Sequence, residues 1–358
     1  MRTRPLGKTG LNAGIVGLGT EYLHQRPRET VVSVVREAIL HGVNYMDFVF
    51  TFPEYLDHLG AALKGQRDKV IITGHLGSAG KNGHYRKTRN LKECEGLFLQ
   101  MLSRLRTEHV DVLFLQFVDE AEDYERMMGP GGLLELALRF QREGKARFIG
   151  LSGHHVPVAL SAVQSGIIDV LMFPINLTSD GVLEEKELFR ACAGEGVGLV
   201  AMKPFAGGKL LQKNEARSLT PVQCLSYTLS QMGVSCAVPG VKDLGELEAA
   251  LHFLDATSAE KDFSAVLTSL PQHAKGACVY CNHCLPCPAL VDIGQTIRLF
   301  DLAQAGVSED LRAEYRALSV KASACTECGS CARRCPFGVD VISKMQQATG
   351  LFETNASA

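Results

Sequence analysis

Short runs of apolar or β-branched residues alternate with longer stretches in which apolar residues recur every three or four positions, from Ala13 to about Leu254. The short runs are typical of parallel strands buried on both faces, and the longer ones of the helices that connect them. The predicted strands are Gly14–Leu18, Val43–Phe48, Lys69–Thr73, Val110–Leu115, Ala146–Leu151, Ile168–Phe173, Val197–Met202 and Ser235–Pro239. Because each strand except the last precedes a predicted helix, the pattern predicts an α/β protein closed into a (β/α)₈ TIM barrel.

The two ends of this alternating region have patterns of their own. The opening segment Arg2–Leu11 is rich in turn residues and is predicted to form a hairpin that plugs the bottom of the barrel. After Leu254 the alternation stops, and a polar, helical-looking stretch runs to Gln272. We therefore expect a barrel domain over residues 1–255 and a second, α-helical ferredoxin-like domain over residues 256–358.

Length and composition agree with this division. The 358 residues exceed the roughly 250 of a typical barrel by about a hundred, which leaves room for a small second domain. With 46% apolar and 21% charged residues, the chain can bury a sizeable core. The net charge is −2, without a long basic or acidic block, so composition argues against nucleic-acid or membrane partners. A small molecule or another protein is the expected partner.

No apolar run reaches the roughly eighteen residues of a membrane span, and no secretory apolar region follows Met1. These observations predict a cytoplasmic protein. Of the twelve cysteines, eight lie between Cys278 and Cys335, and the other four are scattered singly through apolar stretches. The scattered four are expected to behave as small hydrophobic residues.

The eight clustered cysteines form two regularly spaced runs. The first is Cys278, Cys281, Cys284 and Cys287, followed by Pro288, and the second is Cys325, Cys328, Cys331 and Cys335, followed by Pro336. The second run matches the bacterial ferredoxin spacing residue for residue, and the fourth cysteine of such a run ligates the other cluster in two-cluster ferredoxins. Two [4Fe–4S] clusters are therefore predicted. Either the fourth cysteines are exchanged between the runs, or each run binds its own cluster.

Disulfides and zinc are the alternative explanations of these cysteines. A reducing cytoplasm disfavours disulfides. Paired zinc sites lack the regular third and fourth cysteines and the closing proline that both runs have. Iron–sulfur ligation is the preferred interpretation.

Six short segments also stand in a fixed order along the chain. They are Leu6-Gly7-Lys8-Thr9-Gly10-Leu11, Gly17-Leu18-Gly19-Thr20, Gly42-Val43-Asn44-Tyr45-Met46-Asp47, Leu59-Gly60-Ala61-Ala62-Leu63, Arg104-Leu105 before Val110-Asp111, and Met202-Lys203-Pro204-Phe205-Ala206-Gly207-Gly208. In this order, and in register with the eight predicted strands, they resemble the aldo-keto reductase family, in particular its bacterial and archaeal members with an iron–sulfur tail. The resemblance spans essentially the whole chain.

The family is known for NAD(P)H-dependent carbonyl reduction by an Asp, Tyr, Lys and His set. The resemblance places the aspartate at Asp47, at the end of the second predicted strand. It places Phe52 at the tyrosine position, Gly74 at the lysine position and Gln116 at the histidine position. A phenyl ring, a glycine and an amide cannot supply a proton near neutral pH, so three of the four positions depart from the family pattern.

Other titratable residues follow the predicted strands closely enough to replace the missing groups. Tyr55 lies one helical turn beyond the tyrosine position, His75 follows the lysine position, and His154 follows the fifth strand. Because catalytic residues of such barrels gather at the carboxyl ends of the strands, we expect these three residues to face the same barrel mouth as Asp47 and Gln116.

The resemblance also implies positions that would bind a nicotinamide cofactor. They are Ser152 after strand five, Lys203 and Pro204 after strand seven, and Gly240 and Lys242 after strand eight. NADP(H) binding is therefore possible, with Lys242 a candidate for holding a phosphate. Because a loop and helix N-terminus after the eighth strand can bind any phosphate-bearing ligand, the site need not hold NADP(H).

Three hypotheses follow. The preferred one is an oxidoreductase that couples a barrel-mouth site to two [4Fe–4S] clusters, acts on a small polar organic substrate, and exchanges electrons with an external carrier of the ferredoxin or flavodoxin type. The second is a ferredoxin-fed reductase that does not use NAD(P)H. The third is a non-enzymatic electron-transfer or redox-sensing subunit of a partner oxidoreductase. Fold by itself does not decide among them.

Overall fold

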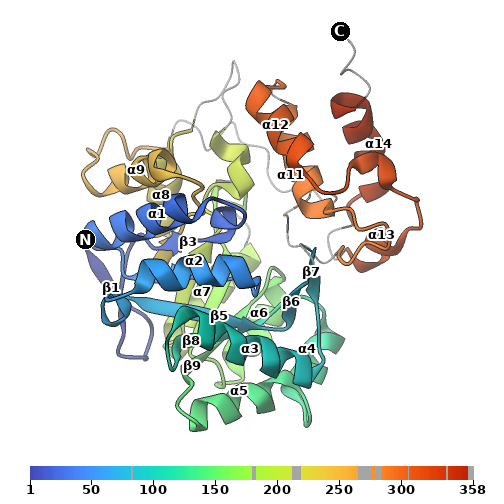
Figure 1. The fold of residues 1–358 in the computed structure, drawn as a ribbon. Coiled ribbons are helices and arrows are strands. Elements are labelled where there is room, and N and C mark those ends of the chain that lie inside the picture. The colour runs from blue at the N-terminus through green and yellow to red at the C-terminus, as the bar shows by residue number, and fades with distance from the viewer. Residues whose placement is uncertain are drawn as a thin grey trace.

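The computed structural model describes residues 1–81, 84–179, 183–211, 219–264, 276, 278, 280, 284–304, 306–335 and 338–353. Within these residues, a parallel sheet of eight strands has the order β3-β4-β5-β8-β9-β10-β11-β12 and forms the barrel in Figure 1. The strands are β3 (Leu18–Gly19), β4 (Tyr45–Asp47), β5 (Ile71–Leu76), β8 (Val110–Gln116), β9 (Ala146–Ser152), β10 (Val170–Pro174), β11 (Gly198–Met202) and β12 (Val234–Val238). The predicted fold class is confirmed.

The barrel closes between its first and last strands by isolated parallel bridges. Val16 pairs with Ala237, and Gly19 pairs with Gly240. The first barrel strand is shorter than the predicted Gly14–Leu18, because Gly14 belongs instead to a hairpin strand at the other end of the barrel. The remaining seven predicted strands overlap the observed ones, with ends that differ by a few residues.

The predicted hairpin at the bottom of the barrel is confirmed. Strands β1 (Thr3–Pro5) and β2 (Asn12–Gly14) pair antiparallel. Between them, the fully buried Leu6 packs with residues of the barrel interior. Gly7 has a φ of +55°, and a Cβ at this position would lie 2.3 Å from the Gly198 nitrogen. Only glycine allows the hairpin to approach β11 this closely.

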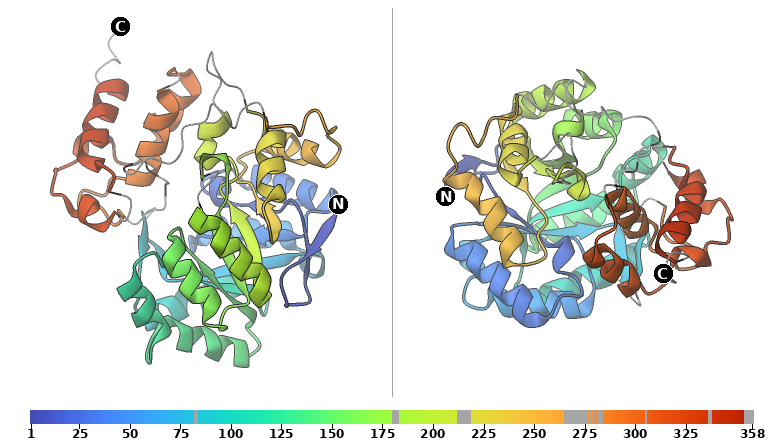
Figure 2. Two further views of the ribbon diagram at one scale, coloured as in Figure 1. Left: turned by 180° about the vertical axis from the view of Figure 1, so that it is seen from behind. Right: turned by 90° about the horizontal axis from the view of Figure 1, so that it is seen from above.

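Helices surround the sheet, as Figures 1 and 2 show. They are α1 (Arg28–Leu40), α2 (Pro53–Leu63), α3 (Leu91–Leu105), α4 (Ala121–Met128), α5 (Leu133–Arg142), α6 (Val156–Gln164), α7 (Leu183–Glu195), α8 (Pro221–Ser230) and α9 (Leu244–Leu251). Short 3₁₀ turns are η1 (Glu21–Leu23), η2 (Arg67–Lys69), η3 (Leu177–Ser179), η4 (Ala206–Leu211) and η5 (His252–Leu254). A hairpin of β6 (Ser78–Lys81) and β7 (His84–Lys87), which was not predicted, follows β5.

The tail forms a second helical unit with its own core. Its elements are α11 (Ile293–Ala303), α12 (Glu309–Ala317), η6 (Ala322–Ala324), α13 (Ser330–Arg334) and α14 (Val341–Phe352). Buried residues such as Ile297, Tyr315 and Met345 pack together in this core. Seen along the barrel in Figure 2, the tail lies on the side where β6 and β7 project. Of the helical-looking stretch predicted to reach Gln272, residues 265–272 lie outside the described residues.

Within the described residues, no helix is both long and apolar enough to cross a membrane.

Helices α2 and α3 pack closely at Gly60, and this contact predicts how a substitution there changes stability. A Cβ on Gly60 would lie 2.3 Å from the Arg104 carbonyl oxygen, whereas a Cβ on Gly96 of α3 would meet nothing within 4 Å. We expect Gly60→Ala to destabilise the fold by about 1–3 kcal/mol through overpacking. Gly96→Ala, the matched control, should stabilise the fold by about 0.5–1 kcal/mol, because alanine has a higher helix propensity than glycine at an exposed helix position. Thermal unfolding at a fixed scan rate distinguishes them, and equal midpoints would contradict the predicted contact.

Candidate functional site

Asp47 forms a polar cluster with two residues of the neighbouring strand. Its Oδ1 accepts hydrogen bonds from the Thr73 hydroxyl and from His75 Nε2, both at 2.7 Å. The His75 side chain is only 1% exposed, whereas Asp47 is 13% exposed. Because a carboxylate accepts, Nε2 of His75 carries the proton in this contact. The structure thus brings together Asp47 and His75, as the sequence predicted.

The structure corrects the assignment of Gly74 to the lysine position of the family. A Cβ on Gly74 would meet Met101 of α3 and the Val110 side chain, so position 74 faces the helices outside the barrel. His75 points inward to Asp47 instead. Successive residues of a strand alternate between its two faces, so a lysine that approaches Asp47 would have to stand at position 75. His75, not Gly74, therefore occupies the place of the family lysine.

Neither Phe52 nor Tyr55 offers a proton at the barrel mouth. The Phe52 ring stacks on His24 with centroids 4.2 Å apart. Tyr55 is 2% exposed, and its hydroxyl shares a hydrogen bond with the Thr20 hydroxyl. Burial raises the pKa of Tyr55 far above its ordinary value. The buried Gln116 accepts a hydrogen bond from the Ser78 hydroxyl of β6 at 2.8 Å, so it helps to hold the hairpin.

A second polar group runs through Asp119, His154 and Lys203. Asp119 Oδ2 accepts from His154 Nδ1 at 3.1 Å, and its Oδ1 accepts from the backbone N–H groups of His154 and His155. Lys203 Nζ lies 2.8 Å from His154 Nε2. Burial, and then the charge of Lys203, lower the pKa of His154. A neutral His154 that donates through Nδ1 and accepts through Nε2 satisfies both partners.

This second group is unusual in its backbone and in its link to the tail. Lys203 has a φ of +55°, which is strained for a residue with a side chain, and Phe117 at the end of β8 has a φ of +60°. Lys203 Nζ also donates to the Tyr280 carbonyl at 3.4 Å. Tyr280 stands between the first two cysteines of the first run. One ammonium group therefore contacts both His154 and the cysteine segment.

Sequence reasoning missed Asp119, Glu21 and His24. Asp119 was detectable as a carboxylate shortly after a strand end. Burial raises the pKa of Glu21, an effect that Lys203 and Arg298 oppose, so this carboxyl group lies within the electrostatic reach of both the barrel mouth and the tail. Nothing in the local sequence distinguishes Glu21 or His24 from ordinary loop residues.

The residues predicted to bind nicotinamide are largely engaged within the protein. Ser152 and Pro204 are buried. A Cβ on Gly240 would lie 2.8 Å from the Tyr22 ring. Lys242 forms ion pairs with Glu246 at 3.2 Å and with Glu314 of α12 at 3.7 Å. As these side chains are placed, they do not fit a dinucleotide.

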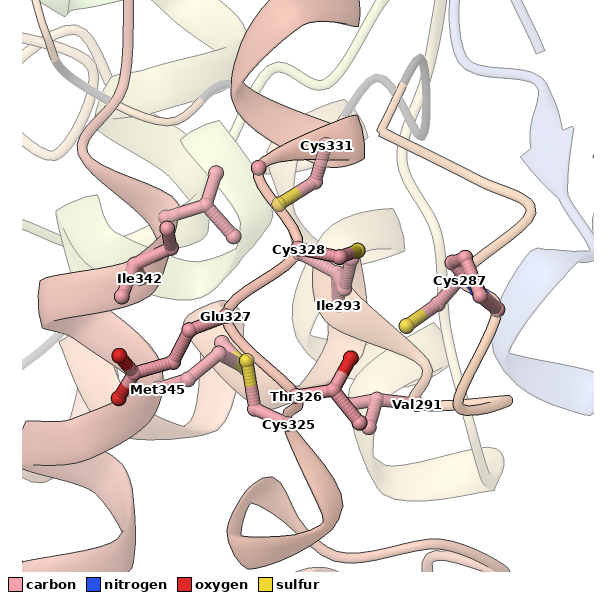
Figure 3. Close-up of a pocket in the computed structure, with 13 residues that line it drawn as sticks. Cys287, Val291, Ile293, Cys325, Thr326, Glu327, Cys328, Cys331, Ile342 and Met345 are labelled. Carbon is pink, nitrogen blue, oxygen red and sulfur yellow. The ribbon is translucent and has the colours of Figure 1, made fainter.

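Four cysteines surround a cavity in the tail. Figure 3 shows Cys287 on one side and Cys325, Cys328 and Cys331 on the others. The remaining lining is mainly apolar and includes Val291, Ile293, Val341, Ile342 and Met345. In the described residues, no three Cys, His, Asp or Glu side chains lie close enough to hold a single metal ion. Four sulfurs spread around an apolar cavity fit a cubane better than zinc. Because Cys287 of the first run lines the same cavity as three cysteines of the second run, the cavity also supports the alternative in which the fourth cysteines are exchanged between the two clusters.

Three of the other cysteines, Cys278, Cys284 and Cys335, pack against the core of the same unit. Arg334 donates to the Cys284 carbonyl, beside Cys335 in sequence. The backbone N–H of Tyr280 donates to Cys278 Sγ and that of Val339 to Cys335 Sγ, both at 3.4 Å. Hydrogen bonds to thiolate sulfur are a usual feature of iron–sulfur sites. Cys281, the remaining predicted ligand, lies outside the described residues.

Asp301 of α11 joins the tail to the barrel. Its Oδ2 accepts from Lys209 of η4 at 2.8 Å and from the Tyr280 hydroxyl at 3.0 Å, and its Oδ1 accepts from Lys344 of α14 at 2.8 Å. Burial acts to raise the pKa of Asp301, but the two lysines outweigh it and the pKa is lowered. The carboxylate is therefore ionised and fully paired.

Comparison with known proteins agrees with this architecture. The Aldo/keto reductase family matches residues 11–223, more than half of the chain. The chain belongs to this family. Residues 275–339 match the 4Fe-4S dicluster domain. This aldo-keto reductase is thus an oxidoreductase with an iron–sulfur tail, as predicted.

Individual relatives are distant. L-glyceraldehyde 3-phosphate reductase of Escherichia coli K12 is 24% identical over 262 residues, which are 65% of this chain and 74% of that protein. A solved aldo-keto reductase structure from Pseudomonas aeruginosa is 24% identical, with a TM-score of 0.57 over 70% of this chain and 95% of its own. The holo form of an aldo-keto reductase from Bacillus halodurans is 20% identical, with a TM-score of 0.64 over 76% and 97%. The two structures support the fold alone.

The cysteine cavity generates a prediction for this aldo-keto reductase. We expect Cys331→Ala to lose one cluster, because the substitution removes one of its four ligands. The iron content should therefore fall by about four atoms per chain. Cys94→Ala, which changes a buried cysteine outside the cavity, should leave the iron content unchanged. Iron and sulfide assays on anaerobically prepared protein measure both effects. Unchanged iron in Cys331→Ala, with native circular dichroism, would contradict the ligand assignment.

The aromatic surroundings of His24 generate a pH prediction. Burial lowers the pKa of His24 to about 4, and neither ring nitrogen has a hydrogen-bond partner in the part of the chain that is described. The unfolded chain binds a proton here below about pH 6.5, whereas the folded protein does not until about pH 4, so stability falls as the pH is lowered through this window. His24→Phe should reduce the slope of the free energy of unfolding against pH by at most about 1.4 kcal/mol per pH unit.

Thermal unfolding between pH 5 and 7 measures this slope. His41→Gln, an exposed histidine that contacts Glu37, is the control and should keep the wild-type slope. An unchanged slope in His24→Phe would show that the imidazole is solvated.

Proposed function

We propose that this aldo-keto reductase is a cluster-coupled oxidoreductase that reduces a small polar organic substrate at the barrel mouth with electrons delivered through its tail. The observation that carries the proposal is the position of Lys203. Its ammonium group contacts His154 of the barrel and the backbone of Tyr280 in the first cysteine run. The groups that handle protons and the segment that would hold a cluster are therefore in direct contact.

Two clusters would be held in different surroundings. Cys278, Cys281, Cys284 and Cys335 would hold one, and Cys287, Cys325, Cys328 and Cys331 the other. The first set is nearer to Lys203, because Tyr280 lies within it. In the second set, Cys328 is exposed. We propose that the exposed site exchanges electrons with an external carrier of the ferredoxin or flavodoxin type, and that the domain boundary lies near Asp255.

Bound clusters of this type supply single electrons. The barrel residues must supply the charge stabilisation and protons that accompany reduction. Lys203, held by His154, would stabilise negative charge that develops on a substrate oxygen. Asp119 is a positioning residue, because it fixes the His154 ring and leaves Nε2 facing Lys203. Asp47 and His75 form a second pair through which a proton can be exchanged at the same end of the barrel.

The test is single-turnover oxidation of the reduced clusters. Cluster-loaded protein, reduced with dithionite and freed of excess reductant, is mixed with small aldehydes and ketones while cluster absorbance is followed. We expect at least one carbonyl compound to reoxidise the clusters. Lys203→Met should slow this reaction about a hundredfold, as for the loss of one stabilising donor, with unchanged iron content.

Lys8→Met provides the control, because Lys8 is exposed at the opposite end of the barrel, where its backbone N–H bonds to Gly196. It should react at the wild-type rate. Wild-type reoxidation by Lys203→Met would contradict the role of Lys203. Failure of every carbonyl compound to reoxidise the clusters would contradict the proposed reaction.

A further inference from the structure

Barrels of this kind frequently bind phosphate at the loops after their seventh and eighth strands, together with a nearby helix N-terminus. In this chain those loops follow β11 and β12 and lead to η4 and α9. The family resemblance places a nicotinamide dinucleotide on the same surface. Both loops instead contact the tail.

The loop after β11 is covered by the first cysteine run and by α11. Gly207 and Gly208 have φ values of +68° and +95°. A Cβ on Gly207 would lie 2.4 Å from the Tyr280 ring, and a Cβ on Gly208 would lie 3.5 Å from Leu302. Lys209 Nζ lies 4.6 Å from the centre of the Tyr280 ring and donates to the Cys278 carbonyl at 3.2 Å. These contacts leave the loop engaged by protein.

The loop after β12 is covered by a different set of side chains. The Tyr22 ring lies against Gly240, and the Arg298 guanidinium of α11 lies over the Tyr22 ring at 5.2 Å. Arg298 also forms an ion pair with Glu314 of α12 at 2.9 Å, and Glu314 reaches Lys242. The cation expected to hold a phosphate is thus paired with a carboxylate from the tail.

The start of α9 is negatively charged rather than open to an anion. Asp243 caps the helix by accepting from the Glu246 N–H at 2.9 Å, and Glu246 accepts from the Lys242 N–H at 3.0 Å. Glu314 adds a third carboxylate beside Lys242. A phosphate would have to displace carboxylates that already use these donors, against like-charge repulsion.

We infer that helices α11 and α12 occupy the surface that a nicotinamide dinucleotide would need, so that the docked tail excludes NAD(P)H from this barrel. The inference goes beyond the proposed function. The proposed function requires electrons to pass through the tail, whereas this inference states that the tail also removes the alternative electron donor. The ion pairs of Glu314 with Arg298 and Lys242 hold α11 and α12 over the loop after β12.

The test is equilibrium binding of NADPH and NADH to full-length, cluster-loaded protein, measured by anaerobic calorimetry. The wild type should show no saturable binding up to about 1 mM, the weak end of the affinity range. Glu314→Lys removes the pairs with Lys242 and Arg298 and replaces them with repulsion. Combined with Lys209→Glu, which places a repelling carboxylate opposite Asp301 and leaves the Tyr280 and Lys344 contacts of Asp301 in place, it should release α11 and α12. The dissociation constant for NADPH should then lie at least tenfold below that limit.

Glu309→Lys is the matched charge control, because Glu309 stands on the same helix and pairs with Arg316 within it. This variant should behave as the wild type. Hydrogen exchange should report faster exchange of the amides of α11 and η4 in the double variant only. Iron content must be unchanged in all three proteins, so that loss of clusters is not mistaken for release of the tail.

The outcomes separate this inference from the proposed function. Saturable NADPH binding by the wild type, with slow exchange in α11, would overturn the inference. Absence of binding in a double variant whose α11 amides exchange faster would also overturn it, because the tail would then not be the cause. Either result leaves reoxidation of the clusters by a carbonyl compound to be decided by its own experiment.

Discussion

The carboxylate of Asp301 is the contact on which the arrangement of this protein depends. It binds Lys209 of the barrel, the Tyr280 hydroxyl of the first cysteine run and Lys344 of α14. A buried carboxylate needs such partners, because an unpaired charge away from water is strongly destabilising. The contacts that pair this carboxylate therefore hold the barrel loop, the cysteine segment and the last helix next to one another.

That arrangement changes the chemistry of the barrel mouth. Phe52, at the position to which the resemblance assigns the family tyrosine, stacks on His24, and the nearby Tyr55 is buried with a raised pKa. The polar groups are instead two carboxylate–histidine pairs, Asp47 with His75 and Asp119 with His154. Lys203 extends the second pair to the tail. Under the proposed function, protons and electrons would therefore be handled on adjacent elements that come from distant parts of the sequence.

Much of the fold was predictable because its signals are local. Buried parallel strands appear as short apolar runs, so all eight barrel strands overlap their predicted ranges, the first only at Leu18. The first strand was predicted to begin at Gly14, but Gly14 pairs with Thr3 of the hairpin, and the regular barrel strand β3 begins only at Leu18. Likewise, the lysine position was assigned one residue early, to Gly74. A shift of one residue in a strand reverses the face, and only the contact between His75 and Asp47 identified the inward side.

By itself, the sequence determined the barrel, the helical tail and the two ferredoxin-like cysteine runs, because hydrophobic period and cysteine spacing are properties of neighbouring residues. The tertiary structure decided which cysteines share a cavity, which histidines meet a carboxylate, and that α11 and α12 cover the loops after β11 and β12. Glu314 meets Lys242, and Tyr280 meets Lys203, across more than seventy residues of chain. Contacts of this kind depend on how separate elements pack, which leaves no periodic pattern in the sequence.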